Sequence, residues 1–164
     1  MLEDIKKIIF EEFPLSDQQT IGDFIGYLEE NGLSFVKDNS AYWVNKWYYW
    51  VQYHNHCVCY ISIMNSDESK NLWTVWSDDI QTDWIKETLS DKSFVQIGLR
   101  HVDQCAHCGS CPGGKEKVIF GHTFDAVCGC TFRVDNPQKE EVNFLKKLIQ
   151  YRIKDIDKIT EMRI

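Results

Sequence analysis

Apolar residues recur at helical intervals at the start of the chain. Residues 2 to 13 predict a short amphipathic helix that Pro14 ends. A second helix is expected from Ser16 to a C-terminal cap at Gly32. Its apolar positions also follow the helical period: Ile21, Phe24, Ile25 and Leu28.

From residue 34 to residue 76 the pattern changes to the alternation of β-strands, with many aromatic and β-branched residues. The strongest prediction is a hairpin whose strands are residues 46 to 53 and 56 to 63, with His54 and Asn55 in the turn. The segment "NLWTVW" predicts a further strand. Aromatic residues occupy both faces of the first hairpin strand. We therefore expect that strand either to be central in a sheet covered on both sides, or to be covered on one side and to line a cavity on the other.

The second half of the chain predicts helices around a cysteine-rich segment. One helix is expected to begin near Thr82, another to run from Ser90 to about Asp103, and a last one to begin at Asn136 with Pro137 in its first turn. The segments "KVIF" and "TFRV" predict two short strands joined through "GHTFDAVCGC". We therefore expect a single α+β domain over residues 1 to 164: an antiparallel, aromatic-rich sheet, N- and C-terminal helices, and a metal-binding loop and hairpin at residues 100 to 133.

Composition and charge narrow the class of protein. The 164 residues are 43% hydrophobic and 26% charged, which is typical of a folded globular chain. A net charge of −7 argues against nucleic-acid binding, which depends on clustered Lys and Arg. No apolar run is long enough to span a bilayer and the N-terminus is unlike a signal peptide, so we expect a cytoplasmic protein that does not bind membranes and whose thiols are reduced.

Five of the seven cysteines fall between residues 105 and 130. The C-x-x-C-G spacing of Cys105, Cys108 and Gly109 is that of a zinc knuckle, in which two thiolates reach one tetrahedral ion and the glycine permits a tight turn. The predicted ligands of a structural zinc ion are Cys105, Cys108, Cys111 and Cys128. The alternates are His101, His107, His122 and Cys130.

Two other interpretations of this segment stay open. The spacing C-x-x-C-x-x-C with a distant cysteine, and the proline after Cys111, are also typical of a [4Fe-4S] cluster and an iron–sulfur redox protein. A thiol-dependent enzyme would instead use Cys130 as nucleophile, His122 or His101 as base and Asp125 as the orienting group. We favour zinc, because Gly109 completes the knuckle and the flanking hairpins suit a closed site.

The hairpin turn offers a weaker metal hypothesis. His54, His56, Cys57 and Cys59 lie within six positions. Because Cys57 and Cys59 are two apart on a strand, they do not easily close a tetrahedron alone. We favour an exposed turn and two cysteines packed into the sheet.

All six tryptophans lie between residues 43 and 84, which exceeds what one buried layer needs. Some are expected in the core. Others are expected to line a surface that binds a small molecule or a protein partner. The candidates are Trp43, Trp47, Trp50, Trp73 and Trp76.

Four segments together suggest a family: "LWTVWSDD", "HVDQCAHCGSC", "VIFGHTFDAVC" and "FRVDNP". They resemble an uncharacterised family of small bacterial cysteine-rich proteins with the pattern W-T-x-W-S-D-D, C-x-x-C-G-x-C and I-F-G-K-x-F-D-x-V-C. The resemblance covers roughly residues 42 to 150 and implies that Cys105, Cys108, Cys111 and Cys128 are the family's cysteines. His122 stands where the pattern has lysine, Cys130 is outside it, and the family implies no activity.

The sequence thus predicts a zinc-binding protein with an aromatic binding surface, and no catalytic signature stands out.

Overall fold

A computed structural model describes residues 2–39, 46–64, 71–78, 88–109 and 112–162 of the chain. Trp43, Cys111 and the helix expected near Thr82 lie outside these residues. In chain order the elements are α1 (Leu2–Glu12), α2 (Leu15–Glu30), β1 (Ser34–Lys37), β2 (Trp47–Tyr53), β3 (His56–Ile63), β4 (Trp73–Ser77), η1 (Thr88–Ser90), α4 (Lys92–Arg100), β5 (Val102–Gln104), β6 (Lys115–Ile119), β7 (His122–Asp135) and α5 (Lys139–Glu161).

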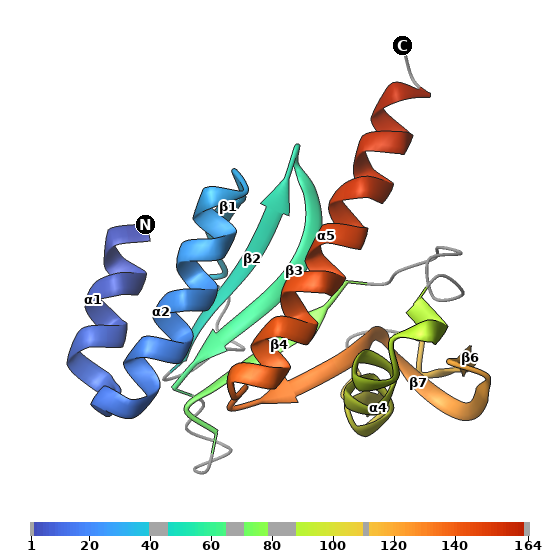
Figure 1. Cartoon of the computed structure of the whole chain (residues 1–164). Coiled ribbons are helices and arrows are strands. Elements are labelled where there is room, and N and C mark those ends of the chain that lie inside the picture. The colour runs from blue at the N-terminus through green and yellow to red at the C-terminus, as the bar shows by residue number, and fades with distance from the viewer. Residues whose placement is uncertain (1, 40–45, 65–70, 79–87, 110–111, 163–164) are drawn as a thin grey trace.

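The strands form one antiparallel sheet in the order β1-β2-β3-β4-β7-β5, and β6 pairs with β7 (Figure 1). The predicted α+β class with an aromatic-rich antiparallel sheet is confirmed. The hairpin of β2 and β3 is also confirmed, within one residue of its predicted ends. His54 and Asn55 have φ angles of 47° and 64°, the pair of positive angles that a two-residue hairpin turn requires.

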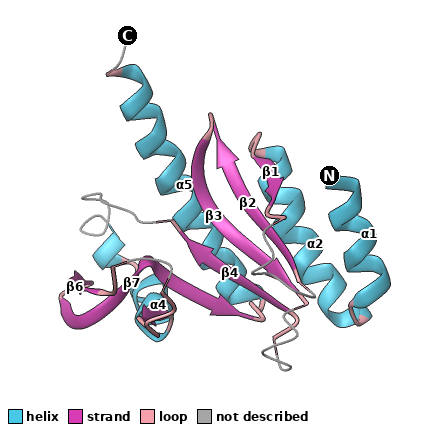
Figure 2. Ribbon diagram, turned by 180° about the vertical axis from the view of Figure 1, so that it is seen from behind, coloured by secondary structure: helices cyan, strands magenta, loops and turns pink. Residues whose placement is uncertain are grey.

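The described helices cover one face of the sheet, and none of them lies on the other face. α2 and α5 lie in front of the strands in Figure 1, and in the reverse view of Figure 2 the strands lie in front. The core forms between this helical layer and alternate sheet residues, among them Tyr49, Val51, Ile61 and Val75. In the described ranges no helix has both the length and the apolar character needed to cross a membrane.

β7 differs most from the sequence prediction. The two short strands expected at residues 117–120 and 131–134 are instead β6 and a 14-residue strand that includes nearly all of the expected connection. The connection is only a tight turn, where Phe120 and Gly121 have φ angles of 51° and 81°. Because β7 is long, it pairs with β6 along its first half, with β5 at Val127 and Phe132, and with β4 near its end.

Two predicted helix ends are also corrected. The helix expected to reach Asp103 ends at Arg100, because the chain turns at His101 and Val102 joins β7 as the first residue of β5. The last helix does not begin at Asn136. Its N-cap is Gln138, in a capping box with Glu141, whose carboxylate accepts the Gln138 N–H at 3.1 Å.

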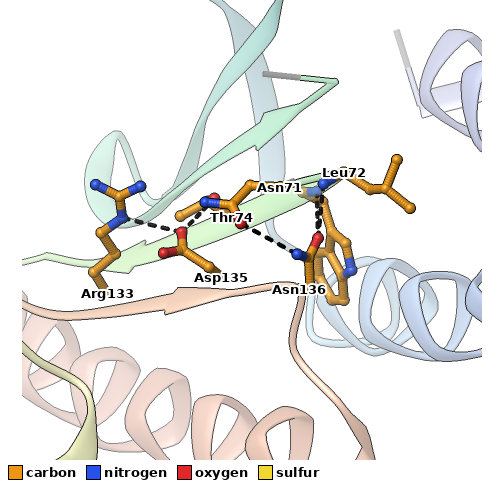
Figure 3. A network of polar contacts seen from close by, with 7 residues as sticks. Asn71, Leu72, Thr74, Arg133, Asp135 and Asn136 are labelled. Carbon is orange, nitrogen blue, oxygen red and sulfur yellow. Dashed lines mark hydrogen bonds and ion pairs between the residues drawn. The ribbon is translucent and has the colours of Figure 1, made fainter. Parts of the chain in front are cut away.

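Asn136 instead holds the end of β7 against the start of β4 (Figure 3). Its Oδ1 accepts the N–H of Leu72 at 2.7 Å and that of Trp73 at 3.3 Å, and its Nδ2 donates to Asn71 Oδ1 at 3.2 Å. Its φ of 46° is one that asparagine tolerates better than most residues. One side chain therefore satisfies two backbone donors at the place where the chain leaves the sheet.

We expect Asn136→Gly to lower the free energy of unfolding by about 1–3 kcal/mol, because two part-buried N–H groups lose their acceptor. Asn136→Ala should lower the free energy of unfolding by about 1 kcal/mol more, because alanine is strained at a positive φ. Urea denaturation of both variants measures the two contributions. Equal stability of both variants and the natural chain would contradict this role.

Candidate functional site

The first candidate site is the turn that follows β5. The N–H of Cys105 donates to the carbonyl of Ala126 at 2.7 Å, which anchors the turn to β7. The N–H groups of His107 and Gly114 then donate to Cys105 Sγ at 3.4 Å and 3.1 Å. Backbone N–H groups directed at a sulfur offset negative charge on it, as they do around metal-bound thiolates.

The glycines explain how this turn closes. His107 and Gly109 have φ angles of 52° and 80°, so the chain reverses between Cys105 and Cys108. Gly114 lies so close to the start of the turn that a Cβ there would be 2.5 Å from Cys105 Cβ and 2.8 Å from the carbonyl carbon of Ala126. Only glycine fits at this position, and its absence of a side chain brings the returning chain onto the sulfur.

The described residues do not bring the other predicted zinc ligands together around Cys105. Cys108 is exposed in the turn, Cys111 lies outside the described residues, and Cys128 is half-buried on β7. Burial raises the pKa of Asp103. A hydrogen bond from the Cys128 thiol and the nearby Arg133 charge partly offset that rise. Within the described ranges no three His, Cys, Asp or Glu side chains form a group that could hold a metal. The zinc site and its iron–sulfur alternative remain predictions.

The alternate ligands lie in different places. His101 Nε2 is 3.7 Å from a Glu141 carboxylate oxygen, His107 is exposed in the turn, and His122 is paired with Ile119 at the far end of β7. Seven residues of β7 lie between His122 and Cys130, which along an extended strand corresponds to roughly 26 Å. Burial, together with Cys128 and nearby carboxylates, raises the pKa of the Cys130 thiol. A protonated thiol remote from His122 is a poor nucleophile for that base. The thiol-enzyme alternative, with His101 as the other candidate base, remains a prediction.

The hairpin cysteines lie near the core. Cys59 is 2% exposed, and Cys57 is half-buried with its Sγ 3.7 Å from the Cys59 carbonyl oxygen. Burial raises the pKa of the Cys57 thiol to about 11. His54 is exposed in the turn, with its ring 4.2 Å from that of Tyr53. These positions match two cysteines packed into the sheet below an exposed turn.

The second candidate site is a line of side chains across the helix-free face of the sheet. Cross-strand pairing runs from Val36 to Trp50, Tyr60, Trp76 and Arg133, one residue from each of five neighbouring strands. Their strand neighbours Tyr49, Val51, Ile61, Val75 and Val134 point into the helix-covered core. Because side chains alternate between faces, these five residues point the other way. We call them the aromatic row.

A second line of residues runs beside the aromatic row on the same face. Tyr48, Ser62, Thr74 and Asp135 are paired across four strands, and the N–H of Asp38 donates to the Tyr48 carbonyl at 2.9 Å. Thr74 Oγ1 donates to Asp135 Oδ1 at 2.7 Å, and Arg133 Nε donates to the same oxygen at 3.0 Å (Figure 3). The aromatic row is thus bordered by hydroxyl groups and carboxylates.

The rings of this face contact one another. The Trp50 ring meets Tyr60 edge-on at 5.3 Å between centroids, and Tyr48 lies 6.1 Å from both Tyr60 and Trp76. The Arg133 guanidinium lies 5.4 Å from the Trp76 ring centroid. Trp50 is 39% exposed and Val36 is 43% exposed, so this end of the aromatic row is open to solvent.

The tyrosine hydroxyls of this face stay protonated. Burial is the main reason why the pKa of Tyr48 and the pKa of Tyr60 rise well above the ordinary value, and neighbouring thiols and the carboxylates of Asp38 and Asp78 raise them further. Tyr60 also donates to Asp78 Oδ1 at 3.5 Å. Both hydroxyls are therefore neutral hydrogen-bonding groups at any physiological pH.

The structure separates the predicted tryptophans. Trp50 and Trp76 belong to the aromatic row. Trp73 is 2% exposed in the core, where its ring lies 5.9 Å from Phe24, and Trp47 packs against the core from the same side. Trp43 lies outside the described residues. Tyr60 and Arg133 were not predicted, although the strand alternation around Trp50 and Trp76 is the signal that could have found them.

Two surface hollows lie elsewhere, beside α4 and the start of α5. One encloses about 420 Å³ and the other about 200 Å³, and both are lined by Ser93, Ile97 and Glu140. Both charges occur along them, with Arg100 in the larger and Asp91 and Lys147 in the smaller. The smaller hollow is also lined by Phe94 and Phe144, but both rings are buried in the core. We therefore give more weight to the aromatic row.

Comparisons with protein-family models, with curated proteins and with solved structures find no match to this chain. The resemblance to the bacterial cysteine-rich family therefore remains a prediction, and function has to be argued from the site itself.

The raised tyrosine pKa values predict a loss of stability in alkali. Burial raises the pKa of Tyr49 to about 12, and the pKa values of Tyr48 and Tyr60 are also raised. In the unfolded chain tyrosine ionises near pH 10, so the contribution of these three residues to the free energy of unfolding should be constant below that pH and fall above it. Tyrosinate absorbance at about pH 11 should show these three residues protonated until the protein unfolds. Their gradual ionisation in the folded state would contradict the prediction.

Proposed function

We propose that this protein binds a small molecule on the aromatic row. The observation that supports the proposal most directly is the alignment of Trp50, Tyr60 and Trp76 across three strands on the face that no described helix covers. Aromatic faces with a few hydrogen-bonding groups beside them are the usual lining of small-molecule sites. Here Tyr48 and Asp135 flank the rings.

The extent of the row favours a small molecule over a protein partner. A stable protein interface buries about 800 Å² on each partner, with an apolar centre. On this face the exposed large apolar side chains among the described residues are Val36 and Trp50. The remaining rings are half-buried and are bordered by carboxylates, so the apolar area suits a ligand of a few rings or methyl groups.

A screen of small planar molecules by ligand titration into 15N-labelled protein tests the proposal. Binding should shift the indole N–H signals of Trp50 and Trp76 and leave that of Trp73 unchanged, because Trp73 is enclosed by the core. Trp50→Ala should weaken the binding about tenfold, since one ring face is lost. Phe10→Ala is the matched control, because Phe10 is 75% exposed on α1 and away from the sheet. Hits that bind without shifting Trp50 or Trp76 would contradict the proposal.

A second candidate function is a structural zinc site formed by Cys105, Cys108, Cys111 and Cys128. The specific observation in its favour is the pair of N–H groups donated to Cys105 Sγ. Zinc held by four thiolates would contribute its binding free energy to folding and fasten the turn to β7. Protein purified without oxygen should contain one zinc per chain, and chelation should lower its melting temperature. Stoichiometric iron, or an unchanged melting curve after complete chelation, would contradict this function.

Gly114→Ala tests the turn directly. Its Cβ would collide with Cys105 Cβ and the backbone of Ala126, so we expect a loss of about 1–3 kcal/mol in the free energy of unfolding. Zinc should also be lost at a lower chelator concentration. Gly129→Ala is the matched control on β7, because a Cβ there meets nothing within 4 Å. If both variants retain zinc equally well, the geometry around Cys105 has no part in metal binding.

A further inference from the structure

The aromatic row already accommodates one positive charge. The Arg133 guanidinium lies over the Trp76 ring, 5.4 Å from its centroid, and Asp135 holds it there. Cations are attracted to the electron-rich faces of Trp and Tyr rings. The next two rings of the row, Tyr60 and Trp50, have no such partner among the described cations. Tyr60 on β3 and Trp50 on β2 offer the same kind of ring surface as Trp76, one strand and two strands away from it.

The charged groups around the row favour a cation over an anion. The described carboxylates that interact with side chains of this face are Asp38 with Tyr48, Asp78 with Tyr60, and Asp103 and Asp135 with Arg133. The basic groups are Arg133 on this face, Arg152, which reaches Asp78 from α5, and Lys46 just before β2. Arg133 is bonded to Asp135, and Arg152 is bonded to Asp78. An anion would have to compete with these carboxylates for an arginine. A cation meets π faces and an excess of acidic oxygens.

The solvent-exposed part of the aromatic row also favours a cation. Trp50 and Val36 are the exposed members. Asp38 follows just after the end of β1, and its carboxylate is close enough to Tyr48 to contribute to the raised pKa of that hydroxyl. A cation on the Trp50 ring would thus have an apolar neighbour and a carboxylate beside it. Methylated ammonium groups need this combination, since they carry charge but cannot replace water with strong hydrogen bonds.

We propose that the ligand of the aromatic row is a small organic cation of the quaternary ammonium class, held on the Trp50 and Tyr60 rings. This inference rests on the proposed small-molecule function and specifies its ligand chemistry. The Tyr60 hydroxyl, which is bonded to Asp78, and the Asp38 carboxylate define the polar border of the site.

The test compares choline with 3,3-dimethylbutan-1-ol, a neutral molecule of nearly the same shape in which carbon replaces the charged nitrogen. Each is titrated into the full-length 15N-labelled protein, and the Trp50 indole signal is followed. We expect choline to shift this signal saturably and the neutral analogue to bind about tenfold more weakly, because it lacks the attraction to the rings and carboxylates.

Variants separate the contributions of ring and charge. Trp50→Ala should weaken choline binding about tenfold, and Trp50→Phe by less, because a smaller π face remains. Asp38→Asn should weaken choline binding a few-fold and leave the neutral analogue unchanged. Phe10→Ala should change neither. Melting curves of the variants check that each one is folded.

Two results would overturn the inference. If the neutral analogue binds as tightly as choline, the row binds small molecules but does not select a cation, and only the ligand class is wrong. If choline leaves the Trp50 signal unchanged, the proposed cation site on the aromatic row is wrong. The screen of planar molecules then decides separately whether the aromatic row binds any small molecule.

Discussion

Backbone pairing along β7 is the constraint on which both candidate sites depend. The strand bonds to β4 through Arg133, Val134 and Asp135, and to β5 and β6 around Val127. The first contact places Arg133 at the end of the aromatic row. The second brings Cys105 beside Ala126 and closes the cysteine turn over the strand. Asn136 fixes the register where β7 ends, since its side chain accepts two N–H groups at the start of β4. A slip of one residue would move every one of these side chains to the opposite face.

The one-sided helical layer explains why the strands are so rich in aromatic residues. In β2, Tyr49 points to the helices and is fully buried, while Trp50 points away and is 39% exposed. In β4, Trp73 and Trp76 divide in the same way. The same short segments therefore supply a core that stabilises the fold and a ring surface that does not contribute to that core. Rings left partly exposed forgo part of the free energy that burial would provide.

Local signals in the sequence were sufficient for much of the fold. Strand alternation and the His54-Asn55 turn predicted the central hairpin within one residue, because a two-residue turn fixes its register locally. β7 was missed because Gly129 and its flanking cysteines suggest a connection, whereas pairing with three other strands keeps the segment extended. The aromatic row was predicted only in part for a similar reason. Which tryptophan faces the helices depends on pairing between distant strands, and neither Arg133 nor Gly114 carries a local sign of its role.

The irregular middle of β7 lies between the two candidate sites. Val102 pairs with Phe132 and Gln104 with Val127, so five steps of β7 stand opposite two steps of β5. Lys117 compensates for the disrupted ladder, with its Nζ donating to the Cys128 carbonyl at 3.2 Å and to Thr131 Oγ1 at 2.9 Å. A bulge of this kind bends the strand and increases its local twist. The bend lies between Val127, which pairs beside the cysteine turn, and Arg133, which pairs with Trp76. The aromatic row is held by its own cross-strand pairs and by the bonds that Asn136 makes at the end of β7.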